Sequence, residues 1–549
     1  MWSSTRIVAL DDGALVIDED SGMLVRTDVE GRPVSEVAIG RSAGQLAFDE
    51  RRKRAYVADR MGDRLVVVDV GAALQIVQAW PTAAEPYGVG LSPDGSLVVV
   101  GMIADRVLVG YDAANGHERY RIPLSPEPRS VVVSPDGKRA LVASARMGVL
   151  DDVALDQSRP SSTIAFDLAC DDCAVGTAYA RGGGAITFLD AQRAVVSFQR
   201  AVPEALGQRA VSRYGGGRLT PVTQHLAFLS FGETTGQVVG QIVANDPRAI
   251  AWDAARDALY VAGRASGTIL RLASLSHSTL DEIGHSAQSF EVTGSEICGP
   301  DGIALSTKGT VYLWCSLSRR VVHVRETGMA EGPAVAASAL APDEHLGMVL
   351  FHATSRAINT DHALACSTCH IDGRTDGLSW KIGHNTLQTP LLTGRLADTA
   401  PYKWDAHDAT LGRSIASTIG RLGGIGLSVA ETDALVTYLE RLPAPRKPTL
   451  DAAAVERGKR VFEGAAGCTE CHGGPRFTDR ELHRFKRSTL DRADTPSLIG
   501  LAASAPYYHD GSAATLDALV RGDGHVKMTD FTTLAAADRA DLVEYLRSL

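Results

Sequence analysis

The chain lacks three features that would define other classes of protein. Its 549 residues contain no run of 18 or more apolar residues, so no segment is expected to cross a membrane as a helix. Basic residues are not in excess: Lys and Arg number 55 against 65 Asp and Glu, and the net charge of -10 argues against binding to nucleic acid or anionic lipid. The start, MWSSTRIVALDDG, has neither the basic nor the long apolar region of a signal peptide. The composition is globular, and the length allows two or more domains.

Cysteine is scarce as well, and half of the eight cysteines form one motif twice. The segments ACSTCHIDGRTDGLSW (Ala365–Trp380) and GCTECHGGPRF (Gly467–Phe477) each contain CxxCH. This motif is the attachment signature of c-type haem. The two thiols bond the vinyl groups of one porphyrin, and the histidine that follows is the proximal iron ligand. We therefore predict two covalent haems, held by Cys366, Cys369, His370, Cys468, Cys471 and His472.

Two alternatives use the same cysteines, and both explain the sequence less well. A CxxC redox pair does not need the histidine, and a zinc site formed by both pairs does not need it twice in the same place. Covalent haem is attached outside the bacterial cytoplasm, so we expect a periplasmic or extracytoplasmic protein whose signal peptide has been removed. In that compartment Cys170 and Cys173 could form a local disulfide, and Cys298 could pair with Cys315.

Residues 1–335 are predicted to form a β-propeller. Segments of similar pattern start at residues 46, 89 and 131, which gives spacings of 43 and 42 residues. Each contains strands separated by polar turns such as SPDG, and the spacing is that of a four-stranded propeller blade. About seven blades would fill this region, and the pattern resembles the seven-bladed YVTN/lactonase-like propellers. A β-sandwich is the alternative. Residues 150–245 lose the period, and we expect loops there, inserted between blades and extending toward the second domain.

The remaining residues are predicted to be helical and duplicated, as an all-α tandem cytochrome c domain. Two units, 336–443 and 444–549, share CxxCH, TPxL, APYxxD, ATL and a closing amphipathic helix. The frame resembles the bacterial di-haem cytochrome c peroxidase and MauG superfamily, most clearly in TPSLIGLAASAPYYHDGSAATL (495–516). This resemblance implies two haems with distinct tasks, electron transfer between them, a redox partner protein, hydrogen peroxide or a related oxidant, and room for a calcium ion.

The resemblance also suggests the sixth iron ligands. In the second unit Met528 stands where relatives place a ligand, and a thioether there would raise the haem potential. His525 is the rival. In the first unit His384 matches a removable distal histidine, although a loop histidine without such a role is equally compatible with the sequence. His407, in KWDAHDATL, is a second distal candidate. Trp404 aligns with the tryptophan between the haems, where an indole suits electron transfer, and a packed core tryptophan is the alternative.

One departure from the superfamily bears on the chemistry. Its peroxidases carry a Gln and then a Glu on the distal side of the peroxidatic haem, and the Glu moves peroxide protons. Residues 409–431 contain no Gln, and their first acid is Glu431, inside the closing helix. The expected function is a periplasmic di-haem oxidoreductase with a propeller that binds partners, in which His384, His407, Arg413 or Arg421 replaces the missing acid. The alternative is a di-haem electron carrier that does not react with peroxide.

Overall fold

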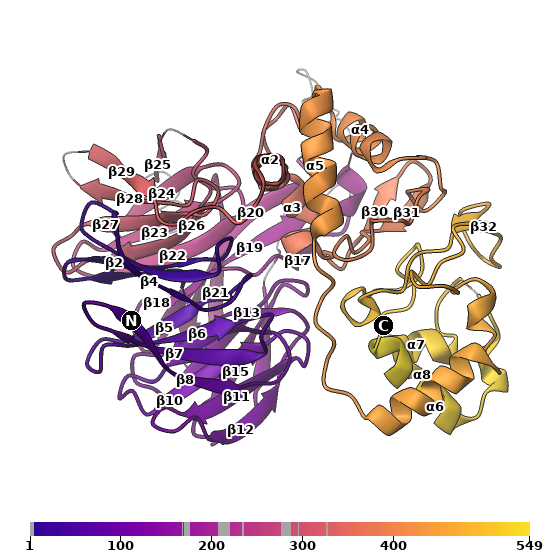
Figure 1. Ribbon diagram of the computed structural model, residues 1–549, viewed down its shortest axis with the longest axis horizontal. Coiled ribbons are helices and arrows are strands. Elements are labelled where there is room, and N and C mark those ends of the chain that lie inside the picture. Colours follow the sequence, from indigo (N-terminus) through magenta and orange to yellow (C-terminus); the bar gives the residue numbers. More distant parts are fainter. Residues whose placement is uncertain are drawn as a thin grey trace.

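Seven antiparallel sheets are arranged as the blades of a propeller, and a helical part lies beside them (Figure 1). The computed structural model describes residues 5–166, 168, 176–206, 220–232, 235–275, 287–294, 296–325, 328–526 and 528–549. The predicted propeller of about seven blades is confirmed, as is the helical domain that follows it. No helix among the described residues is long and apolar enough to cross a membrane.

The first four blades are four-stranded sheets in simple up-and-down order. Their strands are β1 (Ile7–Leu10), β2 (Gly13–Asp18), β3 (Met23–Thr27), β4 (Pro33–Ala38); β5 (Leu46–Asp49), β6 (Arg54–Asp59), β7 (Arg64–Val70), β8 (Leu74–Pro81); β9 (Pro86–Leu91), β10 (Leu97–Met102), β11 (Val107–Asp112), β12 (Glu118–Pro123); β13 (Pro128–Val133), β14 (Arg139–Ser144), β15 (Val149–Ala154) and β16 (Ser162–Ala165).

The last three blades follow the same order with one irregularity. Their strands are β17 (Tyr179–Arg181), β18 (Ile186–Phe188), β19 (Arg193–Ala201), β20 (Val222–Phe231), β21 (Thr235–Ile242); β22 (Pro247–Asp253), β23 (Ala258–Gly263), β24 (Thr268–Ala273), β25 (Gln288–Glu291); β26 (Pro300–Leu305), β27 (Val311–Cys315), β28 (Arg320–Arg325) and β29 (Gly328–Ala334). The ring closes by packing, because Ile7 and Val16 of the first blade share a core cluster with Tyr312 and Trp314 of the seventh.

The SPDG turns explain the regular early blades. Ser92 donates a hydrogen bond of 2.6 Å to Asp94 and accepts one of 3.0 Å from the backbone N–H of Leu97, while Gly95 has a φ of +70°. This closes a tight hairpin that few residues other than glycine allow. Inner strands such as β9 are buried throughout, whereas outer strands such as β12 alternate between exposed and half-buried residues. The blades therefore build their cores from the inner three strands.

The prediction that residues 150–245 are loops between blades is wrong. They contain the outer strand of the fourth blade and the whole fifth blade. Glycines 182–184 divide the inner strand of the fifth blade into β17 and β18, and both pair with the long strand β19. This division and the greater strand length hide the period. The predicted extension toward the helical part is confirmed, because Ala201 and Val222 pack with Leu364 and Trp380.

Five longer helices and several short ones build the C-terminal part, together with two small hairpins. The helices are α2 (Pro342–His352), α3 (Cys366–Cys369), α4 (Leu411–Leu422), α5 (Val429–Arg441), α6 (Ala452–Glu463), α7 (Leu516–Arg521) and α8 (Ala536–Arg547). Short 3-10 turns of this part are η2 (Ile371–Gly373), η3 (Cys468–Glu470), η4 (Leu501–Ala503) and η5 (Phe531–Thr533), whereas η1 (Pro203–Ala205) follows β19 in the propeller. The hairpins are β30 (Ser379–Ile382) with β31 (Asn385–Gln388), and β32 (Leu482–His483) with β33 (Ala493–Asp494).

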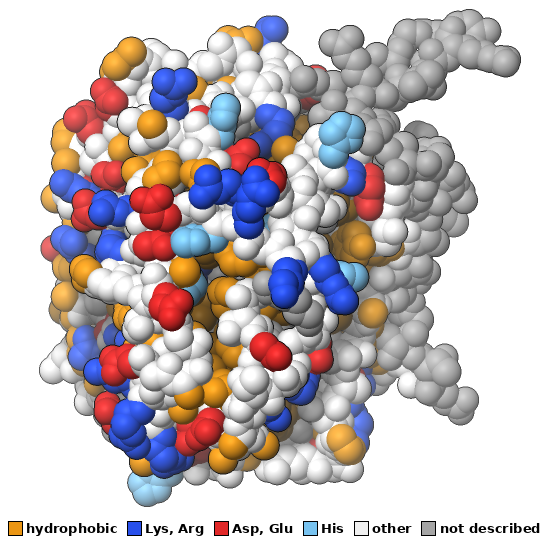
Figure 2. All heavy atoms as spheres, turned by 90° about the vertical axis from the view of Figure 1, so that its right-hand side faces the viewer, with side chains coloured by type: hydrophobic (Ala, Val, Ile, Leu, Met, Phe, Trp, Pro, Cys, Tyr) orange, Lys and Arg blue, Asp and Glu red, His pale blue; other side chains and the backbone are white. Residues whose placement is uncertain are grey.

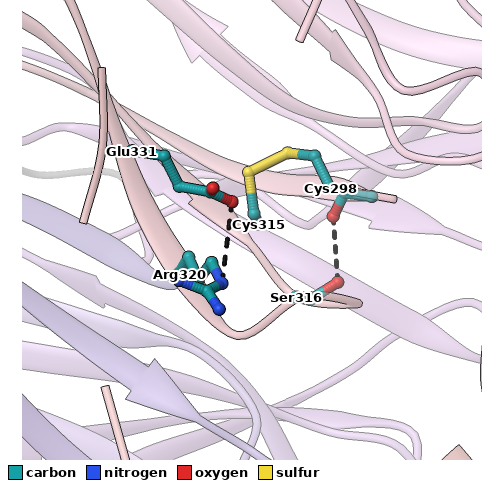
Figure 3. The surroundings of a disulfide bond; sticks show 6 residues. Cys298, Cys315, Ser316, Arg320 and Glu331 are labelled. Atoms are coloured by element: carbon teal, nitrogen blue, oxygen red, sulfur yellow. Dashed lines mark hydrogen bonds and ion pairs between the residues drawn. A yellow bond between two sulfur atoms is a disulfide. The ribbon is translucent and has the colours of Figure 1, made fainter. Parts of the chain in front are cut away.

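The predicted pairing of Cys298 with Cys315 is confirmed (Figure 3). The disulfide lies in the seventh blade, where Cys298 precedes β26 and Cys315 ends β27. The backbone carbonyl of Gly299 accepts a hydrogen bond of 3.0 Å from the Ser316 hydroxyl beside it. Cys170 and Cys173, the other predicted pair, lie outside the described residues.

Candidate haem sites

The two helical units share one architecture, and a glycine marks the equivalent point in each. Gly347 of α2 lies against α5, where an added Cβ would be 2.2 Å from the carbonyl oxygen of Ala434. Gly458 of α6 lies against α8, where a Cβ would be 1.9 Å from the carbonyl oxygen of Asp541. Each helix pair therefore crosses at a distance that only glycine permits. The first and last helices of both units thus form the same close crossing.

The shared sequence motifs have the same structural role in both units. The Tyr402 hydroxyl of the first APY motif donates to the carbonyl of Leu396 at 2.8 Å, and that of Tyr507 in the second donates to Leu501 at 3.1 Å. In both ATL motifs the threonine caps the following helix: Thr410 caps α4, and Thr515 caps α7. The repeated strings are thus structural features of one fold present twice, irrespective of what binds in it.

The first CxxCH motif lies on α3 in apolar surroundings. The Cys366 and Cys369 thiols are unpaired, and burial raises the pKa of Cys366 to about 12. Cys369 shares a cluster with Trp380 and Leu364. Burial lowers the pKa of His370 to about 4, so its imidazole is neutral at pH 7 and has a lone pair for iron. Two reduced thiols, a neutral imidazole and an apolar wall suit a c-type haem.

The second CxxCH motif follows α6, and its histidine orientation is fixed. His472 is buried, and its Nδ1 lies 3.0 Å from the carbonyl oxygen of Phe477. A carbonyl accepts only, so Nδ1 carries the proton and Nε2 keeps its lone pair for a metal. Cys468 belongs to the apolar cluster of this unit, and burial raises its pKa to about 11. Figure 2 shows hydrophobic side chains in a hollow on the side of the molecule where the second unit lies.

The alternatives for these cysteines receive little support. The four CxxCH cysteines are not joined in disulfides. Within the described part of the chain, three side chains that could bind a metal come together once, as Cys471, Asp479 and His483, with ligand atoms within 4.8 Å of one another. This group does not combine the two CxxC pairs, as the zinc alternative requires. Its sulfur and nitrogen atoms also do not suit calcium, which prefers oxygen ligands.

The candidates for sixth ligands are placed on loops. His384 is exposed in the two-residue turn between β30 and β31. His407 is exposed, and its backbone N–H donates to Asp405 at 3.3 Å. Met528 is 38% exposed in the loop between α7 and η5, and His525 is exposed in the same loop. Their roles as ligands stay predictions.

The two arginines among the expected replacements of the distal acid lie on α4, and the first acid of this segment, Glu431, lies on α5. The Glu431 carboxylate caps a helix. It accepts a hydrogen bond of 2.8 Å from the backbone N–H of Ser428, which closes a capping box at the start of α5. Arg413 is exposed in the first turn of α4. Arg421 is half-buried near its end, and Cys369 is among the groups that influence its pKa. Of Arg413 and Arg421, Arg421 is therefore the one that lies near the first CxxCH motif, where Arg181 of the propeller also donates to the Cys369 sulfur at 4.0 Å.

Trp404 joins the two units. Its indole N–H donates to the carbonyl of Gln388 at 2.9 Å, and its own carbonyl accepts from the N–H of Asp494 in the second unit at 2.8 Å. Its ring also meets that of His509 edge-on, with centroids 6.4 Å apart. His509 stands in the APYYHDGS string, and the sequence predicted no role for it. A tryptophan between the units is the placement expected for electron transfer.

Sequence reasoning missed a second group altogether, at the propeller axis. Asp372 and Arg374 lie two and four residues after His370 and form ion pairs with propeller residues, namely Glu85, Glu127, Arg129 and Arg248. The sequence did contain a signal. An acidic residue followed by proline opens the inner strands of three blades, as Glu85-Pro86, Glu127-Pro128 and Asp246-Pro247.

Comparisons with known proteins agree with this geometry. Residues 455–549 match the family described as cytochrome c. The methylamine utilization protein MauG of Methylorubrum extorquens is 26% identical over 286 residues, covering 39% of this chain and 80% of that protein. Hydrazine synthase subunit gamma of Kuenenia stuttgartiensis is 26% identical over 268 residues, covering 36% and 76%. Cytochrome c551 peroxidase of Nitrosomonas europaea is 22% identical over 247 residues, covering 33% and 73%.

The chain is therefore a seven-bladed β-propeller fused to a C-terminal part that contains a cytochrome c domain. Its homologues are MauG, hydrazine synthase subunit gamma and cytochrome c peroxidase, which confirms the resemblance to the cytochrome c peroxidase and MauG superfamily. The cytochrome c domain and these homologues together imply covalently bound haem c.

Proposed function

We propose that the protein is a di-haem c-type oxidoreductase of the cytochrome c peroxidase and MauG type. The observation that carries the proposal is the structural duplication: two helical units with the same glycine crossing each hold one CxxCH motif. The family model covers only the second unit, so the equivalence of the first rests on the structure. When bound, a pair of haem irons supplies one-electron transfer, and an open iron position supplies reaction with a small oxidant such as hydrogen peroxide.

The residues of the chain divide this work between the units. The His472 hydrogen bond to the Phe477 carbonyl holds one tautomer and one ring orientation in the second unit. That unit also has Met528 and His525 in one loop, and we assign it the electron-transfer haem, with Met528 as ligand. The first unit has His384 on a hairpin turn beside Gly383, whose φ is +60°. We assign it the oxidant-facing haem, with His384 as a removable ligand and His407 and Arg421 near the distal side.

The oxidising compartment is part of the proposal. The Cys298–Cys315 disulfide is typical of proteins outside the cytoplasm. Attachment of haem through CxxCH takes place there in bacteria, so we propose a periplasmic protein with a protein redox partner. Contacts at the propeller limit where that partner can bind, because side chains from both haem units already contact one propeller face.

One observation favours the alternative function, an electron carrier. The first acid after the ATL motif, Glu431, caps a helix, and the two loop histidines are exposed. A positioned acid–base group contributes roughly 10²–10⁴-fold to a reaction. We therefore expect peroxide to react more slowly here than in enzymes that carry the distal Glu.

Stopped-flow mixing of the half-reduced protein with hydrogen peroxide tests the proposal. We expect one haem to react and the reaction to withdraw an electron from the other. Trp404→Phe should slow this second step while leaving both haem spectra nearly unchanged, because it keeps an aromatic ring but removes the hydrogen bond to Gln388. If both haems stay low-spin and neither reacts, the carrier function replaces ours.

A further inference from the structure

The turn after the first haem motif contacts the propeller at the inner ends of its blades. Asp372 and Gly373 both have positive φ values, 51° and 72°, so the chain reverses directly after His370 and Ile371. Ile371 borders a small cavity that is otherwise lined by propeller residues, among them Tyr87, Arg129, Arg248 and Asp301. The turn thus presents Asp372 and Arg374 to the inner ends of the blades. Figure 1 shows α3, which precedes the turn, between the propeller and α5.

The two charged residues complete an alternating series of charges. Arg374 pairs with Glu85 and, at 3.0 Å, with Glu127. Asp372 pairs with Arg129 at 3.3 Å and with Arg248 at 3.5 Å. Glu127 and Arg129 also pair with each other at 2.9 Å. With outer partners included, the order along the series is Arg60, Glu85, Arg374, Glu127, Arg129, Asp372, Arg248 and Asp246.

This series, which we call the axial ion series, is buried at its centre, and its positive and negative charges are equal in number. It holds four arginines and four acids, and the side chains of Arg374, Arg129 and Glu85 are at most 4% exposed. Burial alone raises the pKa of Glu127, but Arg374 and Arg129 outweigh it and lower that pKa to about 2. A charge removed from such a site leaves its partner buried and uncompensated.

The second haem motif has no such anchor among the described residues. His472 is followed by two glycines, a proline and Arg476, and Arg476 donates at 2.8 Å to the carbonyl of Ala397 in the first unit. The second unit contacts the propeller through loop arginines: Arg106 donates to the carbonyl of Ala502 and Arg146 to that of Ala505, both at 3.3 Å. Buried opposite charges beside the proximal histidine are thus a feature of the first unit.

We propose that the propeller supports the first haem on its proximal side. Asp372 and Arg374 are the positioning residues, because their ion pairs with the propeller hold the backbone next to His370 in place. This inference rests on the proposed function only in assuming that a c-type haem binds in the first unit. The axial ion series fixes the backbone that carries His370, and it sets the charge close to the first haem. A negative charge there favours ferric iron and a positive charge favours ferrous iron.

Two charge-removing substitutions give opposite expectations. Asp372→Asn should raise the ratio of reduced to oxidised first haem at a fixed solution potential by about tenfold, and Arg374→Met should lower it by a similar factor. Both should broaden or split the electron paramagnetic resonance signal of the first haem and leave the second haem unchanged. Signals are assigned with the full-length double variant Cys366→Ser/Cys369→Ser, which cannot attach the first haem. The conservative changes Asp372→Glu and Arg374→Lys should restore the wild-type potential.

The matched control removes a buried propeller charge away from the turn. Asp18 pairs with Arg319 at 2.5 Å, and their side chains are 1% and 5% exposed. Asp18→Asn should lower stability without changing either haem. The inference is overturned if Asp372→Asn and Arg374→Met resemble this control, or if both shift the potential in the same direction. If Asp372→Asn does not fold, Arg374→Met is compared with Arg374→Lys. Arg374→Met should then lower the ratio of reduced to oxidised first haem, Arg374→Lys should leave it as in the wild type, and equal ratios in the two variants would overturn the inference. Failure of the protein to react with peroxide would contradict the proposed enzymatic function, but it would not contradict the role of Asp372 and Arg374.

Discussion

The two haem units share a fold but differ in what holds their histidines. In the second unit, His472 is oriented by a carbonyl of its own loop, that of Phe477. In the first unit, the loop that follows His370 is anchored in the propeller by Asp372 and Arg374. One site is therefore supported from within its domain and the other from a neighbouring domain.

This difference explains what the propeller contributes to the first unit. Without the propeller, the first unit would expose Asp372 and Arg374. The fifth blade adds apolar contact with Leu364 and Trp380, and Arg181 of that blade pairs with Asp376. The linker to the second unit is also attached to the propeller, because the Thr449 N–H donates to Asp105 at 2.6 Å. The propeller holds the haem module along its length.

The largest expected effect is on haem attachment. We expect two haems per chain in a pyridine haemochrome assay of protein matured in a competent periplasm. Cys366→Ser/Cys369→Ser and Cys468→Ser/Cys471→Ser should each leave one, because each motif anchors its own porphyrin. Cys298→Ser/Cys315→Ser, which removes the propeller disulfide, should leave two. About one haem per chain in the wild type would mean that only one unit binds haem, and the two units could then not be compared as haem sites.

A smaller effect is expected at the helix crossings. Gly347→Val and Gly458→Val place side chains where a Cβ already meets backbone atoms, and overpacking of this kind costs about 1–3 kcal/mol or more. The second unit should lose more stability, since the first is also held by the propeller. Thermal unfolding followed by the absorption of each haem measures both losses. Gly420→Ala is the control, because nothing lies within 4 Å of its added Cβ. Equal losses in both units would contradict the propeller's support.

Ligation of the second iron gives a spectroscopic comparison of the units. If Met528 is the ligand, the oxidised protein should show a weak sulfur-to-iron band near ~700 nm, and Met528→Ala should remove it and lower the potential of that haem. The first haem should keep its spectrum, since its proposed ligand is His384. His525→Ala is the matched control from the same loop. If the low-spin spectrum of the second haem survives Met528→Ala and is lost in His525→Ala, His525 is the ligand.

The sequence predicts this molecule well where local pattern determines structure. Seven blades follow from strand spacing and turn chemistry, and the closing helices follow from amphipathic spacing, with α5 at Val429–Arg441 and α8 at Ala536–Arg547. The CxxCH motifs are legible because covalent attachment fixes both residue types and spacing. The fifth blade was missed because Gly182–Gly184 interrupts its inner strand, and no periodic pattern survives such an interruption.

The ion pairs between the first haem motif and the propeller were not predicted from the sequence. Asp372 and Arg374 look like ordinary loop charges. Asp372 lies 124 residues from Arg248 in sequence, and Arg374 lies 289 residues from Glu85. The same holds for Trp404 and His509, whose contact depends on how the two units pack. Capping by Glu431, by contrast, is visible in the string SVAE, because the capping box is a local motif.

The smallest expected effect concerns Asp494, where the two units meet. Its N–H donates to the carbonyl of Trp404, and one of its carboxylate oxygens is buried without a hydrogen-bond partner among the described residues. Burial, and next the negative charge of Asp479, raise the pKa of Asp494 to about 7. A raised carboxyl pKa means that the folded state binds the proton more tightly, so stability falls as the pH rises from about 4 to about 7. Asp494→Asn mimics the protonated form.

Asp494→Asn should therefore stabilise the second unit at pH 8 and have little effect at pH 4, with the difference growing between these values. Urea unfolding midpoints of the full-length protein at pH 4, 6 and 8 measure it. Asp491→Asn is the matched control, since Asp491 lies in the same segment with a side chain that is 76% exposed. The slope with pH should be unaffected by the control. Parallel curves for wild type and Asp494→Asn would show that this carboxyl titrates normally at the contact with Trp404.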